Sequence, residues 1–309
     1  MKITPLAYDS FGVRSQATLV ETTDQIILLD PGAALGPRRY GMPPTGEEFR
    51  ALELARERII KACRRADIIV VTHYHYDHHP FPRDDEMYDE CFTGKIVLAK
   101  DIRNNINYSG RRRGRFFESR IKDIVESLEW SDGKTYKFDR IWIQVSPAVW
   151  HGEVGSKVGM VIMVLIEDAE TGERFLFGSD AQNLADPAAL EWALKADPDT
   201  AFIDGFPTIF LGWRMKHESF ERSLKHLERF IAETRARRVV VDHHIVRDID
   251  YREKMKPVYE IACRVGKKIE TAAEYIGVDD FFLEAWRKDI RRGARTVDVD
   301  GYYSRLPSV

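Results

Sequence analysis

The spacing of apolar and polar residues predicts short strands that alternate with amphipathic helices along most of the chain. Apolar, β-branched runs predict strands over residues 2–7, 17–21, 25–29, 67–71, 95–99, 140–149, 158–166, 174–177, 200–203 and 238–241. Helical periodicity predicts helices over residues 45–65, 114–128, 187–196, 216–235 and 250–265. The first of these begins at a capping-box pattern, Thr45 to Glu48. Strands in both halves with interspersed helices predict an α/β sandwich.

Length and composition limit how this sandwich is organised. A chain of 309 residues is long enough for two domains or one large one, and no Gly/Ser or Pro-rich linker divides it. We therefore expect a single domain over residues 1–309, with loop and helix insertions around 31–45 and 80–130, including a charged loop over 80–89. The formal charge of −3 argues against nucleic-acid binding through overall charge, although a local basic patch stays open.

Other compositional features bear on location and stability. The first residues carry charge and proline where a signal peptide needs an apolar run, and the longest apolar stretch, 160–166, is too short to span a membrane. Cys63, Cys91 and Cys263 are odd in number and lack metal-finger spacing, so we expect reduced cysteines in a cytoplasmic protein. Charged residues at 31% and only four Gln and four Asn suggest a thermophile.

The strongest chemical signal is a histidine-rich motif directly after a predicted strand. His73, His75, Asp77 and His78 offer four imidazole or carboxylate ligands within six residues. These are ligands for zinc, with Mn, Co, Ni and Fe as competitors. A solvated His-rich loop is the alternative, but the spacing favours a metal site.

Four more strand ends carry polar side chains of the same kind. Asp30, His151 and Asp180 each follow a predicted strand, and His243 and His244 follow the last one. Taken singly, such residues are more often turn-formers or helix caps. Strand ends on one edge of a sheet converge, however, and five of them together predict a shared cleft.

This combination of motifs resembles the metallo-β-lactamase superfamily, over most of the chain. The resemblance implies a four-layer αββα sandwich with metals at one edge of the paired sheets. The segments PLAYDSFGVRS, DPGAALGPRRYGMPP and DHHIVRD look closer still to a mainly archaeal hydrolase branch, which supplies no settled substrate.

The resemblance also implies roles for individual residues. The first metal would take His73, His75 and His151, and the second would take Asp77, His78 and a late histidine. Asp180 would bridge the two ions. For the late histidine, the similarity to zinc-dependent tRNA-processing endonucleases, with Arg247 four residues on, favours His243, and His244 is the alternative. Asp30 and His79 would support the ligands rather than bind metal.

Charge then predicts the chemistry. Two divalent ions, Asp77, Asp180 and a bridging hydroxide leave a net charge of about +1, which favours an anionic substrate attacked by that hydroxide. We expect a metal-dependent hydrolase, with Asp77 and Asp180 in the catalytic centre. Phosphodiesters are the first choice of substrate, with broad substrate tolerance. Lactones, carboxylic esters and thioesters stay open, as does a non-catalytic metal-binding protein. The resemblance argues against the di-iron flavoprotein branch, because a His replaces its Glu, and against a dedicated lactamase.

Two further segments could contact substrate. Arg112, Arg113 and Arg115 form a basic cluster flanked by aromatic residues, and Arg247 follows the last ligand; all four are candidates for substrate binding. The cluster is more typical of a solvated helix start, so we expect a small ester or phosphodiester rather than nucleic acid, which stays possible. The apolar loop 206–213 predicts either a wall of the cleft or core packing.

Overall fold

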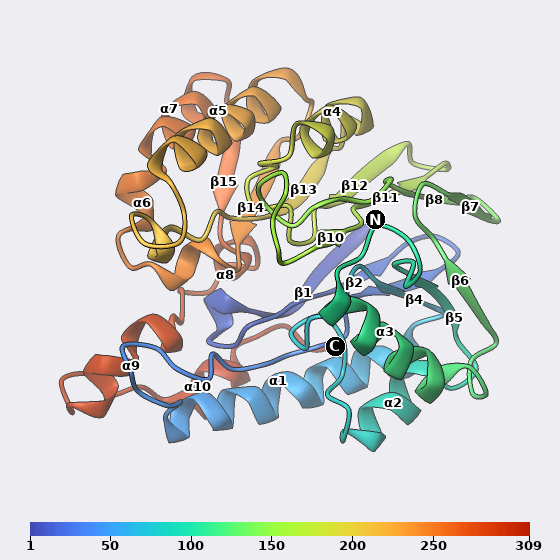
Figure 1. Cartoon of the computed structure of the whole chain (residues 1–309), viewed down its shortest axis with the longest axis horizontal. Helices are drawn as coiled ribbons and strands as arrows, with labels where there is room; N and C mark the ends of the chain where they lie inside the picture. Colours follow the sequence, from blue (N-terminus) through green and yellow to red (C-terminus); the bar gives the residue numbers. More distant parts are fainter.

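Two mixed β-sheets lie face to face in the computed structural model, which describes residues 1–309 (Figure 1). The first sheet has the order β1-β2-β3-β4-β5-β6. Its strands are β1 (Lys2–Tyr8), β2 (Gln16–Glu21), β3 (Ile26–Leu29), β4 (Ile68–Val71), β5 (Ile96–Ala99) and β6 (Ser127–Trp130). The strands β1 to β3 pair antiparallel and β3 to β6 pair parallel, so the ends of β3 and β4 leave the sheet on the same edge.

The second sheet has the order β15-β14-β13-β12-β11-β8-β7. Its strands are β7 (Thr135–Phe138), β8 (Ile141–Val145), β11 (Val164–Asp168), β12 (Glu173–Phe177), β13 (Thr200–Asp204), β14 (Arg238–Asp242) and β15 (Lys268–Glu270). The strands from β12 to β15 are parallel. A separate two-stranded ribbon joins β9 (Val149–Trp150) to β10 (Met160–Val161).

Helices cover the outer face of each sheet. Figure 1 shows α1 (Gly46–Arg65), α2 (Asp85–Phe92) and α3 (Tyr108–Ile121) below the first sheet, and α4 (Pro187–Ala196), α5 (His217–Glu233) and α7 (Lys256–Arg264) above the second. The remaining helices are α6 (Tyr251–Lys254), α8 (Ala272–Tyr275), α9 (Leu283–Arg291) and α10 (Val299–Ser304). One buried cluster contains side chains of both sheets, such as Val70 and Phe202, so the core lies between them. The predicted αββα arrangement is confirmed.

Several predicted boundaries were wrong for local reasons. The predicted helix 114–128 is α3, which starts earlier because Asn107 caps it, and β6 occupies the end of the predicted range. Half of the predicted loop 80–89 belongs to α2, which Asp84 caps. The predicted helix 250–265 is divided into α6 and α7 at Met255. Pro257, in the first turn of α7, has no backbone N–H to donate and so cannot continue the hydrogen bonding of α6.

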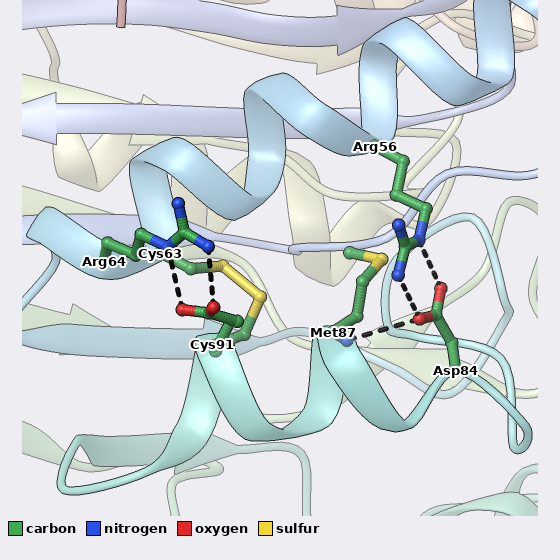
Figure 2. The surroundings of a disulfide bond; sticks show 7 residues. Arg56, Cys63, Arg64, Asp84, Met87 and Cys91 are labelled. Atoms are coloured by element: carbon green, nitrogen blue, oxygen red, sulfur yellow. Dashed lines mark hydrogen bonds and ion pairs between the residues drawn. A yellow bond between two sulfur atoms is a disulfide. The ribbon is translucent and has the colours of Figure 1, made fainter.

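The prediction of three reduced cysteines was also wrong. Cys63 in α1 and Cys91 in α2 form a disulfide with a Cα–Cα distance of 4.6 Å, and Cys263 alone is free (Figure 2). Two bidentate ion pairs, Arg56–Asp84 and Arg64–Glu90, join the same two helices on either side of the disulfide. The cysteine count alone could not reveal this disulfide. Its two cysteines lie 28 residues apart on different helices and meet only in the folded chain. No helix is both long and apolar enough to cross a membrane.

Candidate metal centre

The predicted site residues meet at one edge of the two sheets, where strands end in strained turns. Asp30 follows β3, Ser179 follows β12 and His243 follows β14, and their φ angles are 48°, 47° and 63°. Residues with a Cβ rarely adopt this left-handed conformation, and such strain gathers at functional sites. Gly32 contributes differently, because a Cβ there would lie 2.3 Å from the backbone nitrogen of His79. The chain therefore packs the loop after β3 directly against the His-rich loop after β4.

One group of side chains joins His73, His75, His151 and Asp180. One ligand atom from each lies within 4.8 Å of the others. Asp180 Oδ2 is 2.9 Å from His151 Nε2 and 3.4 Å from His73 Nε2. Three imidazoles and a carboxylate at this spacing are a familiar donor set for a divalent transition metal.

A second group joins Asp77, His78 and His243 by the same criterion. His243 Nε2 lies 3.6 Å from Asp77 Oδ2. Asp180 reaches this group through its other oxygen, since Oδ1 is 3.1 Å from His78 Nε2 and 3.6 Å from His243 Nε2. Asp180 thus presents one carboxylate oxygen to each group.

The buried atoms of the centre are not satisfied by one another. His78 Nε2, His151 Nε2 and Asp180 Oδ2 are inaccessible to solvent, and their contacts of 2.9–3.1 Å with one another and with Asp180 Oδ1 do not have hydrogen-bond geometry. Leaving a buried polar group without a partner costs about 1–3 kcal/mol, and here three such atoms point into one small region. The donor set and these orphaned atoms fit two metal ions.

Outer residues hold each ring from its far side, as is usual for metal-binding histidines. Asp30 accepts both the Thr72 backbone N–H and its hydroxyl, and its Oδ2 lies 2.8 Å from His78 Nδ1. Gln182 Nε2 is 3.2 Å from His151 Nδ1. Asp30 also lies within 4.8 Å of a ligand atom of His73 and of His78, so its supporting role stays a prediction. His79 lies outside both groups, and its ring packs against Tyr74 and Phe117.

Gln182 was missed in the sequence, and so were other outer residues of the centre. Asp9, in the turn after β1, lies 2.7 Å from His243 Nδ1 and accepts a 2.7 Å hydrogen bond from Arg247 Nε. Gln16 donates from Nε2 to Asp180 Oδ1 at 2.6 Å. Both lie in the N-terminal segment, far in sequence from the motifs. Asp9 could have been noticed as a polar turn residue directly after an apolar strand, whereas Gln16 gave no such signal.

The two late histidines have different surroundings. His243 is fully buried, and its Nε2 faces Asp77 and Asp180. His244 is 13% exposed at its side chain, lines the cleft above the centre, and keeps Nδ1 2.8 Å from Asp204 Oδ2. His244 also lies within reach of Asp180 and His243. The geometry therefore supports His243 within the second group and leaves His244 facing the cleft.

Burial and charge set the protonation of these groups. Burial lowers the pKa of His75 to about 3 and holds that of His73 well below its usual value. Burial would raise the pKa of Asp180, but the neighbouring His78 and His243 outweigh it and lower that pKa strongly. Burial likewise opposes protonation of His78, yet Asp180 and Asp30 raise its pKa well above normal. Metal binding at His78 would therefore release a proton.

A cleft of about 1490 Å³ opens over the centre. It is lined by three carboxylates, Asp77, Glu153 and Glu218, and by seven basic residues, Arg14, Arg113, Lys157, Arg214, Lys216, Arg222 and Arg247. Of the predicted substrate-binding residues, Arg113 and Arg247 line the cleft, whereas Arg112 and Arg115 are exposed on other faces of α3 and do not. Both alternatives predicted for the loop 206–213 are found in different parts of it: Phe206 is buried in the core, and Phe210 lines the cleft.

The chain is similar in sequence to proteins of several archaea. It is 39% identical to a UPF0282 protein of Pyrococcus abyssi over 308 residues, covering 97% of this chain and 96% of that one. It is 40% identical to a UPF0282 protein of Thermococcus gammatolerans over 307 residues, covering 97% and 98%. The chain belongs to the UPF0282 family. This identity confirms the expected relation to an archaeal branch, and no protein-family model matches the UPF0282 chain.

Solved structures share the fold of this UPF0282 chain at low sequence identity. Yeast PDE1 superposes with a TM-score of 0.53 at 12% identity, covering 87% of this chain and 96% of that one. An isothiocyanate hydrolase from Delia radicum gut bacteria gives 0.50 at 14% identity, covering 88% and 95%. CmlA, a diiron β-hydroxylase from Streptomyces venezuelae, gives 0.53 at 14% identity, but this chain spans only 51% of it. The chain has the metallo-β-lactamase fold, with buried His and Asp side chains gathered as candidate metal ligands.

Proposed function

We propose that this protein is a dinuclear metal-dependent hydrolase that cleaves phosphodiesters. The observation that carries the proposal is Asp180, which offers one oxygen to each of two buried ligand groups whose nearby polar atoms lack other partners. One ion would be held by His73, His75 and His151, the other by Asp77, His78 and His243, and Asp180 would bridge them. Zinc is the first choice of metal, because imidazole nitrogen dominates both groups.

The cleft supports an anionic substrate. The fold does not choose the reaction, since the structures that share it include both a hydrolase and a diiron hydroxylase. The seven basic residues around the cleft outnumber its three carboxylates, one of which, Asp77, would bind metal. A phosphodiester keeps its negative charge at neutral pH, whereas a lactone or thioester carries none at the reacting group. The charge of the cleft therefore favours the phosphodiester.

The residues around the centre have separable roles in this reaction. When bound, such ions lower the pKa of water and polarise a substrate oxygen. Asp9 fixes the ring of His243 from behind and holds Arg247, whose Nη2 is 3.3 Å from that ring. Asp204 fixes His244, so that its free ring edge faces the cleft and can hydrogen-bond a substrate oxygen. These contacts keep both rings in place before substrate arrives.

Metal reconstitution with a substrate panel tests the proposal. The protein is stripped with a chelator, reloaded with Zn, Mn, Co or Ni, and its metal content is measured by elemental analysis. We expect about two ions per chain and metal-dependent hydrolysis of bis(p-nitrophenyl) phosphate in preference to a lactone, a carboxylic ester or a thioester. Preference for one of those three would replace the phosphodiester with that class. Loading without hydrolysis of any substrate would indicate a non-catalytic metal-binding protein.

A further inference from the structure

The basic residues of the cleft divide into two kinds. Arg14, Arg222 and Arg247 are each paired with a carboxylate, of Glu284, Glu153 and Asp9 respectively. Arg113, Lys157, Arg214 and Lys216 also line the cleft but form no ion pair with any carboxylate of the protein. A cation already paired contributes little to ligand binding. The four unpaired cations are therefore the ones available to external anions.

Two of the unpaired arginines lie on aromatic rings. The Arg113 guanidinium is 4.8 Å from the centre of the Tyr76 ring, and Tyr76 stacks on Phe81 with centroids 4.6 Å apart and planes at 21°. The Phe81 side chain is 44% exposed. Tyr76, Phe81 and Arg113 all line the cleft. This first platform presents a flat apolar face beside a free positive charge.

A second platform comes from a distant part of the chain, the loop between β13 and α5. Arg214 lies 4.3 Å from the Trp213 ring and 5.7 Å from that of Phe210, and the two rings are 6.0 Å apart. Trp213 is 71% exposed and lies at the rim, next to the lining residue Arg214, without itself lining the cleft. Phe210, Arg214 and Lys216 line the cleft. An exposed aromatic ring beside an unpaired arginine therefore recurs on a segment unrelated in sequence to the first.

We propose that the cleft binds single-stranded nucleic acid, with bases stacked on the two aromatic platforms and flanking phosphates at the four unpaired cations. Alternating rings and cations are the surface that an unpaired strand needs, since every base has a face to stack and every nucleotide a charge. The bases of a duplex are already stacked on one another and cannot use these rings. The cleft volume of about 1490 Å³ also exceeds the 300–1,000 Å³ typical of small-ligand pockets.

The proposal rests on the proposed function only for cleavage of the strand, because binding is measured separately. Fluorescence anisotropy with the full chain would use a labelled oligouridylate of about 12 nucleotides, within the usual range of site sizes. We expect it to bind at least tenfold more tightly than the corresponding duplex or uridine monophosphate. If each of the four cations contacts one phosphate, the logarithm of the association constant should fall with the logarithm of the salt concentration with a slope of roughly −2.8, at about −0.7 per contact.

Variants locate the strand within the cleft. The double variant Arg113→Gln/Arg214→Gln should weaken oligonucleotide binding at least tenfold and reduce the salt slope by about 1.4. Trp213→Ala should weaken binding by about tenfold through lost stacking, and Trp213→Phe should restore most of it. The control Arg237→Gln/Arg292→Gln removes two exposed arginines that do not line the cleft and should leave binding unaltered.

The outcomes separate this proposal from the previous one. Tight, salt-dependent binding that needs the two platforms, without hydrolysis of any phosphodiester, would support the strand-binding cleft and overturn the proposed function. Hydrolysis of bis(p-nitrophenyl) phosphate together with oligonucleotide binding no tighter than that of uridine monophosphate would do the reverse. Tighter binding of duplex than of single strand, or equal losses in the control variant, would also overturn the strand-binding proposal.

Discussion

Two buried polar clusters of this protein are built on opposite principles. At the candidate metal centre, three buried atoms of His78, His151 and Asp180 have no hydrogen-bond partner. In the second cluster Arg287, of α9, is fully buried against Glu48 of α1. Its guanidinium donates to both Glu48 oxygens and to the carbonyls of Met42 and Gly36, so each of its nitrogens is satisfied.

The difference separates a cluster that completes the fold from one that is itself incomplete. The Arg287–Glu48 pair joins the C-terminal helices to the start of α1, and Glu48 also accepts the backbone N–H of Thr45 in the capping box. The candidate metal centre instead leaves ligand atoms without hydrogen-bond partners, at the expense of local stability. We therefore expect substitutions in the two clusters to act on different quantities, activity in one and stability in the other.

The largest effect is expected from Asp180→Ala. Loss of the one residue that faces both ligand groups should abolish detectable hydrolysis of bis(p-nitrophenyl) phosphate and reduce the bound metal, while circular dichroism shows the fold retained. Asp123→Ala, at an exposed aspartate away from the centre, is the control and should behave as the parent protein does. Unchanged turnover in the Asp180 variant would remove the basis of the two-metal proposal.

Arg287→Met should show the opposite pattern. It leaves Glu48 buried and charged without its partner, which typically costs about 3–5 kcal/mol in the free energy of unfolding. Denaturant titration would measure this cost, and turnover per folded molecule should stay near the parent value. The double variant Arg287→Met/Glu48→Gln removes the orphaned charge but keeps an oxygen for the cap. If the double variant is no more stable than Arg287→Met alone, the cost of that substitution does not come from the unpaired charge of Glu48.

The disulfide should matter less, because other contacts join the same helices. Opening Cys63–Cys91 by Cys63→Ala/Cys91→Ala should lower stability by about 2–4 kcal/mol, as expected for a loop of this length. The ion pairs Arg56–Asp84 and Arg64–Glu90 would still hold α1 to α2, so the metal content should not change. A lower metal content in the double variant would show that the disulfide also helps to position the candidate metal ligands.

The smallest effect depends on pH and belongs to His79, a buried histidine beside the centre. Burial lowers its pKa to about 4. In the unfolded chain the imidazole of His79 takes up a proton at about pH 6.5, which is its ordinary pKa. The contribution of His79 to stability is therefore complete above pH 6.5 and is lost as the pH falls to 4, by about 2 kcal/mol at pH 5. In metal-free protein, His79→Phe should therefore lose less stability between pH 7 and 5 than the parent. The control His217→Phe, at an exposed histidine, should lose as much stability between pH 7 and 5 as the parent.

Much of the fold was predictable because its signals are local. The strand of residues 67–71, the capped helix from Thr45 and the helix 187–196 follow from apolar runs and caps within a few residues. The fold class is confirmed, while the ligand assignment and the single domain over 1–309 stay predictions. The short strand β7 escaped notice because its four residues, two exposed and two half-buried, form no apolar run.

The parts that could not be predicted depend on tertiary contacts. Neighbouring residues on a helix point about 100° apart, so the start of α3 at Tyr108 decides that Arg113 faces the cleft and Arg112 and Arg115 do not. The contact of Asp9 with His243 spans 234 residues. Such pairings arise only when the two sheets meet, and no local pattern encodes them.

The disulfide has a consequence for the denatured chain. It closes a covalent ring over residues 63–91, and this ring contains His73, His75, Asp77 and His78. Even without native structure, these four side chains stay tethered near one another and can act as a loose chelator. By mass action, metal bound to the unfolded chain offsets part of the stabilisation that it gives to the native one. Added metal should therefore raise the melting temperature of the oxidised protein by less than its affinity for the native state implies. In the variant without the disulfide, the same metal should raise the melting temperature by the full amount.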